Sequence, residues 1–185
     1  MSKNWPKFVL GWIISFLVRL IPSRPPNFEP VLSIQMPFSK AYGYLPAFFF
    51  AFFNIALYDA VTMRVGVWTW ITALIYGLLG IWGYMFFKKR ESTAGNYLKF
   101  SIMATLAYDA LTGLSIGPLF FNQTFTEALI GQIPFTIFHL LGNGALALLV
   151  SPLVYRLVTG QSPILLINYE QVKIWKQPST PKSRQ

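Results

Sequence analysis

The sequence predicts an all-α membrane protein in which six transmembrane helices form one bundle, with both termini in the cytoplasm. Of its 185 residues, 54% are hydrophobic and only 11% are charged, against about 25% charged residues in a typical soluble domain. Long apolar runs recur along the chain, and a spanning helix needs about 20 such residues. The basic residues concentrate in alternate connections between these runs, which is the pattern of a multi-pass membrane protein.

The residues that the chain contains exclude several classes of site. It has no cysteine and a single histidine, His139, which excludes disulfides, thiolate-bound metals and a multi-histidine metal site within the chain. A net charge of +9 would suggest nucleic acid in a soluble protein, but here the basic residues flank apolar runs, where they set orientation and meet anionic headgroups. We therefore expect a lipid bilayer around the chain, no nucleic-acid partner, no metal and no cofactor.

The first two apolar runs are the shortest. Residues 7–21 resemble a signal peptide, but no small-residue cleavage site follows them, so we interpret them as a retained first span. Their Arg19 is expected to reach toward the membrane surface. The Pro-rich stretch 22–30 ends this helix. The second run, 31–44, contains Pro37 and a lysine and is short for a span, so three alternatives stay open: a tilted helix, a helix buried among the others, or a re-entrant segment.

Four further runs are long enough to cross the bilayer, and a polar tail follows them. Pro134 and Pro152 lie inside the last run, where each is expected to kink the helix. We assign residues 1–160 to a six-helix transmembrane domain and residues 161–185 to a cytoplasmic tail that is partly interfacial or disordered. The four runs comprise residues 44–65, 67–87, 97–121 and 128–158.

The distribution of positive charge supports six crossings, including the weak second one. With six spans and a cytoplasmic N-terminus, twelve of the 15 Lys and Arg residues lie on the cytoplasmic side, and only Arg19, Arg24 and Arg64 lie outside. This bias agrees with the positive-inside rule. If residues 31–44 did not cross, every later connection would change sides, and the basic run 88–90 would face outward.

A five-residue motif occurs twice in the chain. Residues 58–62 read Tyr-Asp-Ala-Val-Thr, and residues 108–112 read Tyr-Asp-Ala-Leu-Thr. Both copies lie near the outer end of a run that is expected to pass from inside to outside. Parallel repeats of helical units are common in transporter folds, so the motif indicates an internal repeat. Coincidence in a chain of such biased composition is the alternative.

Polar residues recur along one side of four of the runs. Their spacing places them on one helical face, and facing stripes would form a small polar cavity within the bundle. Polar side chains at this depth are costly and usually face a partner or a cavity, although Ser, Thr and Asn also act simply as hydrogen-bonded contacts between helices. The stripes are Asn54, Tyr58 and Thr62; Thr69, Thr72 and Tyr76; Ser101, Thr105, Tyr108 and Thr112; and Gln132, Thr136, His139 and Asn143.

Three ionisable residues within the runs are the strongest candidates for ligand contact. Asp59, Asp109 and His139 are harder to explain as helix contacts; ion pairing with one another, or capping of helix ends by the two carboxylates, are the alternatives. Trp68 and Tyr108 lie near the presumed outer ends of their runs. An interfacial aromatic belt explains them without a ligand, and stacking on a ring-containing substrate is the other reading.

Six short stretches of the sequence together carry a resemblance to a known family. They are Arg19-Leu20-Ile21-Pro22, Pro26-Asn27-Phe28-Glu29-Pro30-Val31, Asp59, Gly66-x-Trp68-Thr69, Tyr108-Asp109-x-Leu111-Thr112 and Pro134-Phe135-Thr136-x-x-x-His139-x-x-Gly142-Asn143. With these stretches the chain resembles, over residues 8–157, the S components of energy-coupling factor (ECF) transporters. These small membrane subunits capture vitamins and other micronutrients. The similarity is closest to members whose substrate is unassigned.

The resemblance implies a six-helix substrate-binding domain in a prokaryotic cell membrane, which works with a membrane coupling protein and two cytoplasmic ATPase subunits. The chain has no phosphate-binding loop of its own. In the family, two alanines on the first helix contact the coupling protein, and Gly11 and Ser15 occupy that kind of position here. The residues expected to bind the small-molecule substrate are Asp59, Trp68, Thr72, Tyr108, Asp109, Thr112, His139 and Asn143, with Asn27 and Glu29 in an outer loop over the site.

Two other classes of function fit the same residues. A membrane scaffold of the rod-shape MreD-like type needs no ligand, and its polar stripes would be contacts between helices. A membrane enzyme acting on a lipid diphosphate would hold Mg²⁺ between Asp59 and Asp109, but two lone carboxylates without an acidic cluster argue against it. The sequence contains no serine-hydrolase elbow or zinc-protease motif, so we expect a protein that is not an enzyme.

Overall fold

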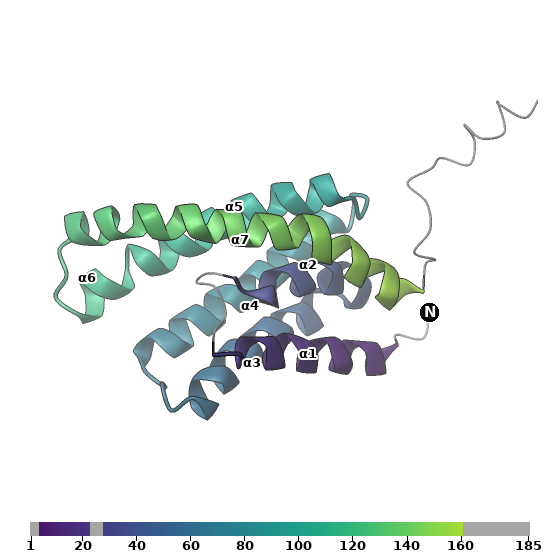
Figure 1. Cartoon of the computed structure of the whole chain (residues 1–185), viewed down its shortest axis with the longest axis horizontal. Helices are drawn as coiled ribbons and strands as arrows, with labels where there is room; N and C mark the ends of the chain where they lie inside the picture. Colours follow the sequence, from purple (N-terminus) through teal and green to yellow (C-terminus); the bar gives the residue numbers. More distant parts are fainter. Residues whose placement is uncertain (1–3, 23–27, 161–185) are drawn as a thin grey trace, which may run out of the picture.

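The chain folds into a bundle of helices, which the computed structural model in Figure 1 shows. The structure describes residues 4–22 and 28–160, and these contain seven α-helices and no β-strand. The predicted all-α class is therefore confirmed, whereas the predicted tail, 161–185, lies outside the described residues. The helices are α1 (Trp5–Arg19), α2 (Pro30–Tyr42), α3 (Tyr44–Val61), α4 (Val67–Phe87), α5 (Ala94–Gly113), α6 (Ile116–Phe120) and α7 (Phe125–Thr159).

Four stretches of helix in the described residues are long and apolar enough to cross a membrane. They are α3, α4, α5 continued through α6, and α7, and they are compatible with a multi-pass membrane protein. The helices α1 and α2 have 15 and 13 residues. At about 1.5 Å per residue they extend about 22 and 20 Å, less than the roughly 30 Å of a hydrocarbon core. Helix length therefore establishes four candidate spans and not six.

Helix α2 lies among the other helices instead of facing lipid. Eleven of its 13 residues are buried, and it contacts α1, α3, α4, α5 and α7. Of the three alternatives that the sequence left open for this run, the structure shows the buried helix. Burial also explains its polar composition, because a helix surrounded by protein does not have to present an apolar surface to lipid. Ser33, Gln35 and Ser39 are all buried.

Pro37 in the middle of α2 accounts for one contact between α2 and α7. A proline has no N–H, so the carbonyl four residues earlier, that of Ser33, has no helical donor. The hydroxyl of Ser151 in α7 donates to this carbonyl oxygen at 2.7 Å, and Ser151 is fully buried. The proline therefore provides a backbone acceptor to which α7 is fixed.

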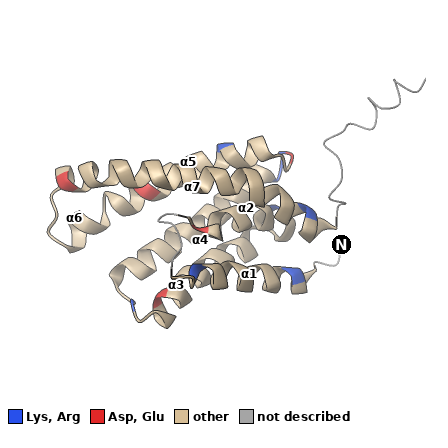
Figure 2. Ribbon diagram, in the orientation of Figure 1, with Lys and Arg blue, Asp and Glu red and all other residues tan. Residues whose placement is uncertain are grey.

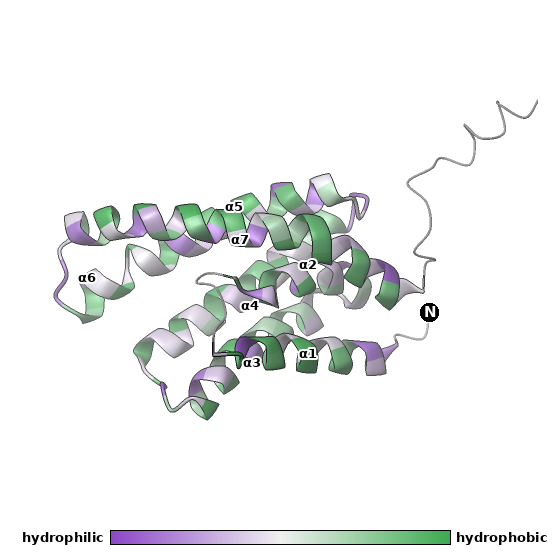
Figure 3. Ribbon diagram, in the orientation of Figure 1, coloured by the Kyte–Doolittle hydropathy of each residue, from purple (hydrophilic) through white to green (hydrophobic). Residues whose placement is uncertain are grey.

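Two helical hairpins pack on α2. One consists of α3 and α4 and the other of α5 and α7, and the two helices of each hairpin lie in extensive contact (Figure 1). Helix α1 contacts α2 and α3, and its Trp12 indole N–H donates to the carbonyl of Phe50 at 3.1 Å. Hydrophobic residues predominate along these helices (Figure 3), and many large ones are exposed on the outside of the bundle, as a lipid environment requires.

Both ends of α7 are set by capping residues. The Thr124 hydroxyl accepts the Glu127 N–H at 3.2 Å, and the Glu127 carboxylate accepts the Thr124 N–H at 2.9 Å, which is a capping box. Gly160 ends the helix with φ 71°, a left-handed conformation that glycine adopts without strain. The helix continues through both of its prolines.

Positive charge gathers at one end of the bundle (Figure 2). There the Lys7 ammonium donates to the carbonyl of Leu157 at 2.6 Å, which joins the start of α1 to the end of α7. The Lys40 ammonium donates to the carbonyl of Arg90 at 2.5 Å, which joins the end of α2 to the α4–α5 connection. We call this end, which also carries Lys88, Lys89 and Lys99, the basic end.

Helices α1, α2, α3, α4, α5 and α7 alternate in direction between the basic end and the opposite end. At the opposite end, Arg19 at the end of α1 contacts Glu29 before α2 and Tyr58 near the end of α3. Thr69 at the start of α4 contacts Asp59 near the end of α3. The chain therefore passes from one end of the bundle to the other six times, although two of these passes are short.

Candidate functional site

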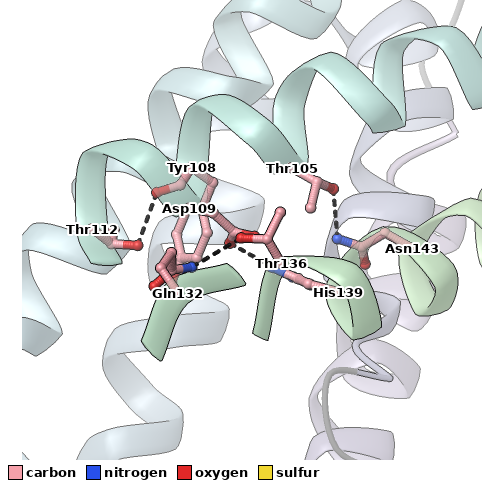
Figure 4. Close-up of polar contacts among 8 residues, drawn as sticks. All are labelled: Thr105, Tyr108, Asp109, Thr112, Gln132, Thr136, His139 and Asn143. Carbon is pink, nitrogen blue, oxygen red and sulfur yellow. Dashed lines mark hydrogen bonds and ion pairs between the residues drawn. The ribbon is translucent and has the colours of Figure 1, made fainter. Parts of the chain in front are cut away.

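Two polar pairs join α5 to α7 inside the bundle (Figure 4). The Nδ1 atom of His139 lies 2.7 Å from Oδ1 of Asp109, and the two side chains are 3% and 2% exposed. One turn away, the Asn143 amide donates to the hydroxyl of Thr105 at 2.9 Å. All four residues are buried, and we call them the α5–α7 polar contact.

The antiparallel packing of α5 and α7 explains why these residues meet. Thr105 and Asp109 are four residues apart on one helix, and His139 and Asn143 are four residues apart on the other, so each pair shares a helical face. In antiparallel helices, a residue one turn earlier on one helix lies beside a residue one turn later on the other, so Asp109 meets His139 and Thr105 meets Asn143. The two polar stripes that the sequence predicts for these helices therefore face each other at these positions.

The α5–α7 polar contact contains more hydrogen-bond acceptors than it satisfies. Asp109 Oδ2 and Asn143 Oδ1 are buried and have no hydrogen-bond partner within the described ranges, and the same is true of the hydroxyl of Ser101, one turn before Thr105 in α5. A buried polar atom without a partner costs about 1–3 kcal/mol. A hydrogen-bond donor brought by another molecule would remove this cost.

A groove of about 310 Å³ runs between α5 and α7 over the α5–α7 polar contact. Asp109 contributes to its lining but is only 1% exposed, so the carboxylate lies beneath an apolar rim. The rim residues Leu106, Ile133 and Ile137 are exposed on the outside of the bundle. This hollow therefore opens toward lipid, and it differs from the inward-facing polar cavity that the stripes predict.

A second polar cluster lies where α1 ends and α2 begins. Nη2 of Arg19 lies 3.6 Å from Oε1 of Glu29, and the guanidinium carbon lies 4.5 Å from the centre of the Tyr58 ring in α3. We call these three residues the Arg19 cluster. Arg19 is 6% exposed, so the expectation that it reaches to the membrane surface is wrong. Glu29 and Tyr58 hold its charge within the bundle instead.

Two tyrosines pack against each other beside the α5–α7 polar contact. The rings of Tyr76 in α4 and Tyr108 in α5 have centres 4.5 Å apart, and the Tyr108 ring meets the His139 ring edge-on at 5.8 Å. Both tyrosines also lie within electrostatic range of Arg19 and Glu29. Side chains from α1, α4, α5 and α7 thus converge on one aromatic centre.

Gln35 is a residue that the sequence analysis did not single out. Its amide nitrogen donates to the carbonyl of Ala47 in α3 at 3.1 Å and to the carbonyl of Tyr76 in α4 at 2.8 Å, and it is 1% exposed. Gln35 therefore fixes the backbone that carries Tyr76. The signal for it was present, because a glutamine inside an apolar run is costly unless protein surrounds it.

Asp59 belongs to a different contact from Asp109. The Thr69 hydroxyl donates to Asp59 Oδ2 at 2.5 Å and accepts the Gly66 N–H at 3.1 Å, so it joins the end of α3 to the start of α4. Asp109 pairs with His139. A Mg²⁺ site shared by the two carboxylates, which the lipid-diphosphate hypothesis needs, finds no support in these pairings. In the described part of the chain no three His, Asp or Glu residues gather into a possible metal site.

Three other predicted site residues make local contacts. The hydroxyls of Thr72 and Thr112 each donate at 2.8 Å to a carbonyl of their own helix, those of Trp68 and Tyr108. The Trp68 side chain is partly exposed, and its ring lies 5.9 Å from the ring of Phe121. These positions agree with helix packing and with an interfacial aromatic residue.

The two Tyr-Asp-Ala-x-Thr motifs have the same local structure. The hydroxyls of Thr62 and Thr112 donate to the carbonyls of Tyr58 and Tyr108, each at 2.8 Å. The aspartate of each motif contacts a side chain on the next long helix of its own hairpin. The repeated sequence therefore occupies equivalent positions in the hairpins α3–α4 and α5–α7.

Gly11 and Ser15, the predicted docking residues, lie against helices of the chain itself. A Cβ atom on Gly11 would lie 2.4 Å from Cζ of Phe38 in α2, and Ser15 is fully buried. Gly11 therefore allows Phe38 of α2 to approach α1 closely, and Ser15 has no accessible surface for a coupling protein in this arrangement. Docking of a partner near Gly11 stays a prediction. Asn27, predicted to cover the site, lies outside the described residues.

Comparison of the chain with family models, with curated proteins and with solved structures finds no match to any of them. The contacts in the bundle, and the chemistry that they allow, are therefore the basis for a function.

Proposed function

We propose that the chain is the substrate-capturing membrane subunit of an ATP-driven importer of the ECF type. It would cross the cell membrane of a prokaryote six times, with both termini in the cytoplasm, and take a small micronutrient from the outside. A membrane coupling protein and cytoplasmic ATPase subunits would supply the energy. The observation that carries the proposal is the α5–α7 polar contact with its two unpartnered acceptors.

A purely structural role explains the α5–α7 polar contact only in part. A hydrogen bond between two membrane helices contributes about 0.6 kcal/mol on average, whereas each buried acceptor without a donor costs about 1–3 kcal/mol. If this contact served only to hold α5 against α7, the bundle would be more stable without Asp109 Oδ2 and Asn143 Oδ1. A ligand with N–H or O–H groups would turn both atoms into favourable contacts, which supports a binding role.

Charge supports the six crossings and their orientation. The six longer helices alternate in direction, and the basic end carries the lysines of the α4–α5 connection together with Lys7 and Lys40. Basic residues concentrate on the cytoplasmic side of membrane proteins, which puts both termini of the bundle there. Helix α2 would cross inside the protein, where its polar residues cost little.

Single cysteines test this topology, because the chain has none of its own. Met63 between α3 and α4 is 91% exposed, and Glu91 in the α4–α5 connection is exposed as well. A Met63→Cys variant should react with a membrane-impermeant maleimide on intact cells, whereas Glu91→Cys should react only after the membrane is permeabilised. The reverse pattern, or labelling of both variants from outside, would contradict the orientation.

Identification of a co-purifying compound tests substrate capture. The full chain is purified in mild detergent, and small molecules released by denaturation are identified by mass spectrometry. A compound enriched on the wild type should be lost from Asp109→Asn and His139→Ala. It should be retained by Thr159→Val, which removes an exposed hydroxyl that bonds only to its own helix at the basic end. Capture at this site is disproved if no compound is enriched, or if both site variants retain it.

A membrane scaffold of the MreD-like type is the second candidate. One observation favours it: both pairs of the α5–α7 polar contact use side chains of the chain itself, and the groove above them opens toward lipid. Under this reading, replacing Asp109 and His139 together by a leucine and a phenylalanine should leave the protein folded and functional, because a buried polar pair can often be exchanged for apolar residues. Under the capture reading, the same double variant loses the bound compound.

A further inference from the structure

We propose that the captured compound carries an oxyanion, a carboxylate or a phosphate, and that Arg19 binds it. This inference rests on the proposed function and names the chemical class of its substrate. The oxyanion follows from the Arg19 cluster, and the hydrogen-bond donors at the other end of the molecule follow from the α5–α7 polar contact. The ligand class that follows is a small, flat molecule with an acidic group at one end and hydrogen-bond donors at the other.

The first argument is the state of the Arg19 guanidinium. The residue is 6% exposed, and its Nε and Nη1 atoms are buried without any hydrogen-bond acceptor in the part of the chain that the structure describes. Its contact with Glu29 is an ion pair at 3.6 Å through Nη2, longer than the roughly 2.7–2.9 Å of a charge-assisted hydrogen bond. Nε–H and Nη1–H lie on different edges of the planar guanidinium, and each can donate to an oxygen of a carboxylate or phosphate.

The second argument is the surface beside the guanidinium. The Tyr58 ring lies under it, with 4.5 Å between the ring centre and the guanidinium carbon. Tyr76 and Tyr108 pack on each other at 4.5 Å and lie within electrostatic range of Arg19. These aromatic side chains come from three different helices, and their faces suit a flat ring. An ion pair that only fastened the end of α1 would not need them.

The third argument is that one cluster has unpartnered donors and the other has unpartnered acceptors. The unpartnered atoms at Arg19 are donors, whereas those at Asp109 and Asn143 are acceptors. Arg19 and Asp109 form no ion pair with each other within the described residues. Tyr76 contacts Tyr108, Tyr108 contacts His139, and both tyrosines lie within electrostatic range of Arg19 and of Asp109. A molecule with an oxyanion at the Arg19 end and N–H or O–H groups at the other end would bond to both the donors and the acceptors.

The test compares the compound released from the wild type, from Arg19→Gln and from Arg64→Gln. Arg64 is the matched control, because it is an exposed arginine in the α3–α4 turn at the same end of the bundle. We expect a compound with a carboxylate or phosphate group, retained by Arg64→Gln and reduced roughly tenfold to a hundredfold on Arg19→Gln, as the loss of a charge-assisted contact predicts. A neutral or cationic compound, or equal retention by Arg19→Gln, overturns the inference.

A second measurement separates ligand contact from a structural role of Arg19. Binding of the identified compound to the wild type is compared with binding of its neutral counterpart, the amide of a carboxylate or the dephosphorylated form of a phosphate. The wild type should bind the acid more tightly by roughly tenfold or more, and Arg19→Gln should lose this preference. If Arg19 only stabilised the fold, both forms would weaken equally. If Arg19→Gln does not fold, the wild-type measurement is sufficient. Equal binding of the acid and of its neutral counterpart to the wild type contradicts the inference.

The two proposals fail in distinguishable ways. Enrichment of a compound without an acidic group contradicts the role of Arg19 but leaves substrate capture intact. The absence of any enriched compound contradicts both. Weaker binding of the amide indicates that the oxyanion is a carboxylate, and weaker binding of the dephosphorylated form indicates that it is a phosphate.

Discussion

Replacing Gly80 with alanine tests the close packing that positions the aromatic centre. Gly80 lies in α4, where a Cβ atom would be 2.4 Å from Nε2 of Gln35 and 2.6 Å from the carbonyl oxygen of Ala47 in α3. The second atom belongs to the backbone and cannot rotate away. Either α4 moves away from α3, or Gln35 leaves its hydrogen bonds to Ala47 and Tyr76. Gly131 in α7 is the matched control, because nothing lies within 4 Å of a Cβ atom there.

The magnitude follows from the difference between the two substitutions. Alanine is favoured over glycine within a helix by about 0.8–1 kcal/mol, and this gain applies to both positions and cancels. Over-packing at Gly80 costs about 1–3 kcal/mol, and loss of one Gln35 hydrogen bond adds about 1 kcal/mol. The free energy of unfolding of Gly80→Ala should therefore be lower than that of Gly131→Ala by about 1–4 kcal/mol.

Reversible unfolding in mixed micelles, at increasing mole fraction of sodium dodecyl sulfate, measures this difference. Tryptophan fluorescence reports the transition, since six Trp residues are distributed along the chain. Gly80→Ala should unfold at a clearly lower denaturant fraction than Gly131→Ala. Equal stability of the two variants would refute the close approach of α4 to α3, and with it the placement of Tyr76.

Three further predictions concern single contacts, each measured by the same unfolding assay. Thr69→Val should lower the free energy of unfolding by about 1–3 kcal/mol because it leaves the partly buried Asp59 carboxylate without its donor. Thr72→Val should change this free energy by no more than about 0.5 kcal/mol because that hydroxyl bonds within its own helix. Equal effects of the two changes would contradict the contact between α3 and α4. Ser151→Ala should cost about 1–3 kcal/mol, since it leaves a buried carbonyl without a partner, and an unchanged stability would show that α7 does not rest on α2 there. A double-mutant cycle with Asp109→Asn and His139→Ala should give a coupling of about 0.6–2 kcal/mol, whereas additive effects would place the two side chains apart.

The sequence predicts the helices well because their apolar runs are long and their ends are marked. The run 67–87 matches α4, and the run 128–158 lies within α7, which starts at a capping box and stops at Gly160. Positive charge also indicates which ends of the helices lie together. These features are local, so they can be read from residue order alone.

The burial of α2 and the direction of the Arg19 side chain could not be predicted from such local features. Whether a short run with a proline is re-entrant or buried depends on which helices surround it. Gln35 indicates that protein surrounds the run, but residues 31–44 do not show which helices do so. Arg19 has the sequence context of a residue that reaches the membrane surface, but Glu29 and Tyr58 hold it inward. Facing stripes on α5 and α7 were predictable from spacing, whereas Gln35 is explained only by the carbonyls of two other helices.

The distribution of unsatisfied groups is what separates a binding site from a network that stabilises the fold. A network of buried charges is stable when each ion finds its counterpart within the protein. Within the described residues, one oxygen of Asp109 lies 2.7 Å from Nδ1 of His139, and the other has no hydrogen-bond partner. The same residues likewise leave two nitrogens of Arg19 without an acceptor. These groups pair with other residues and not with each other in the described residues, and a molecule from outside with an oxyanion at one end and N–H or O–H groups at the other could satisfy both.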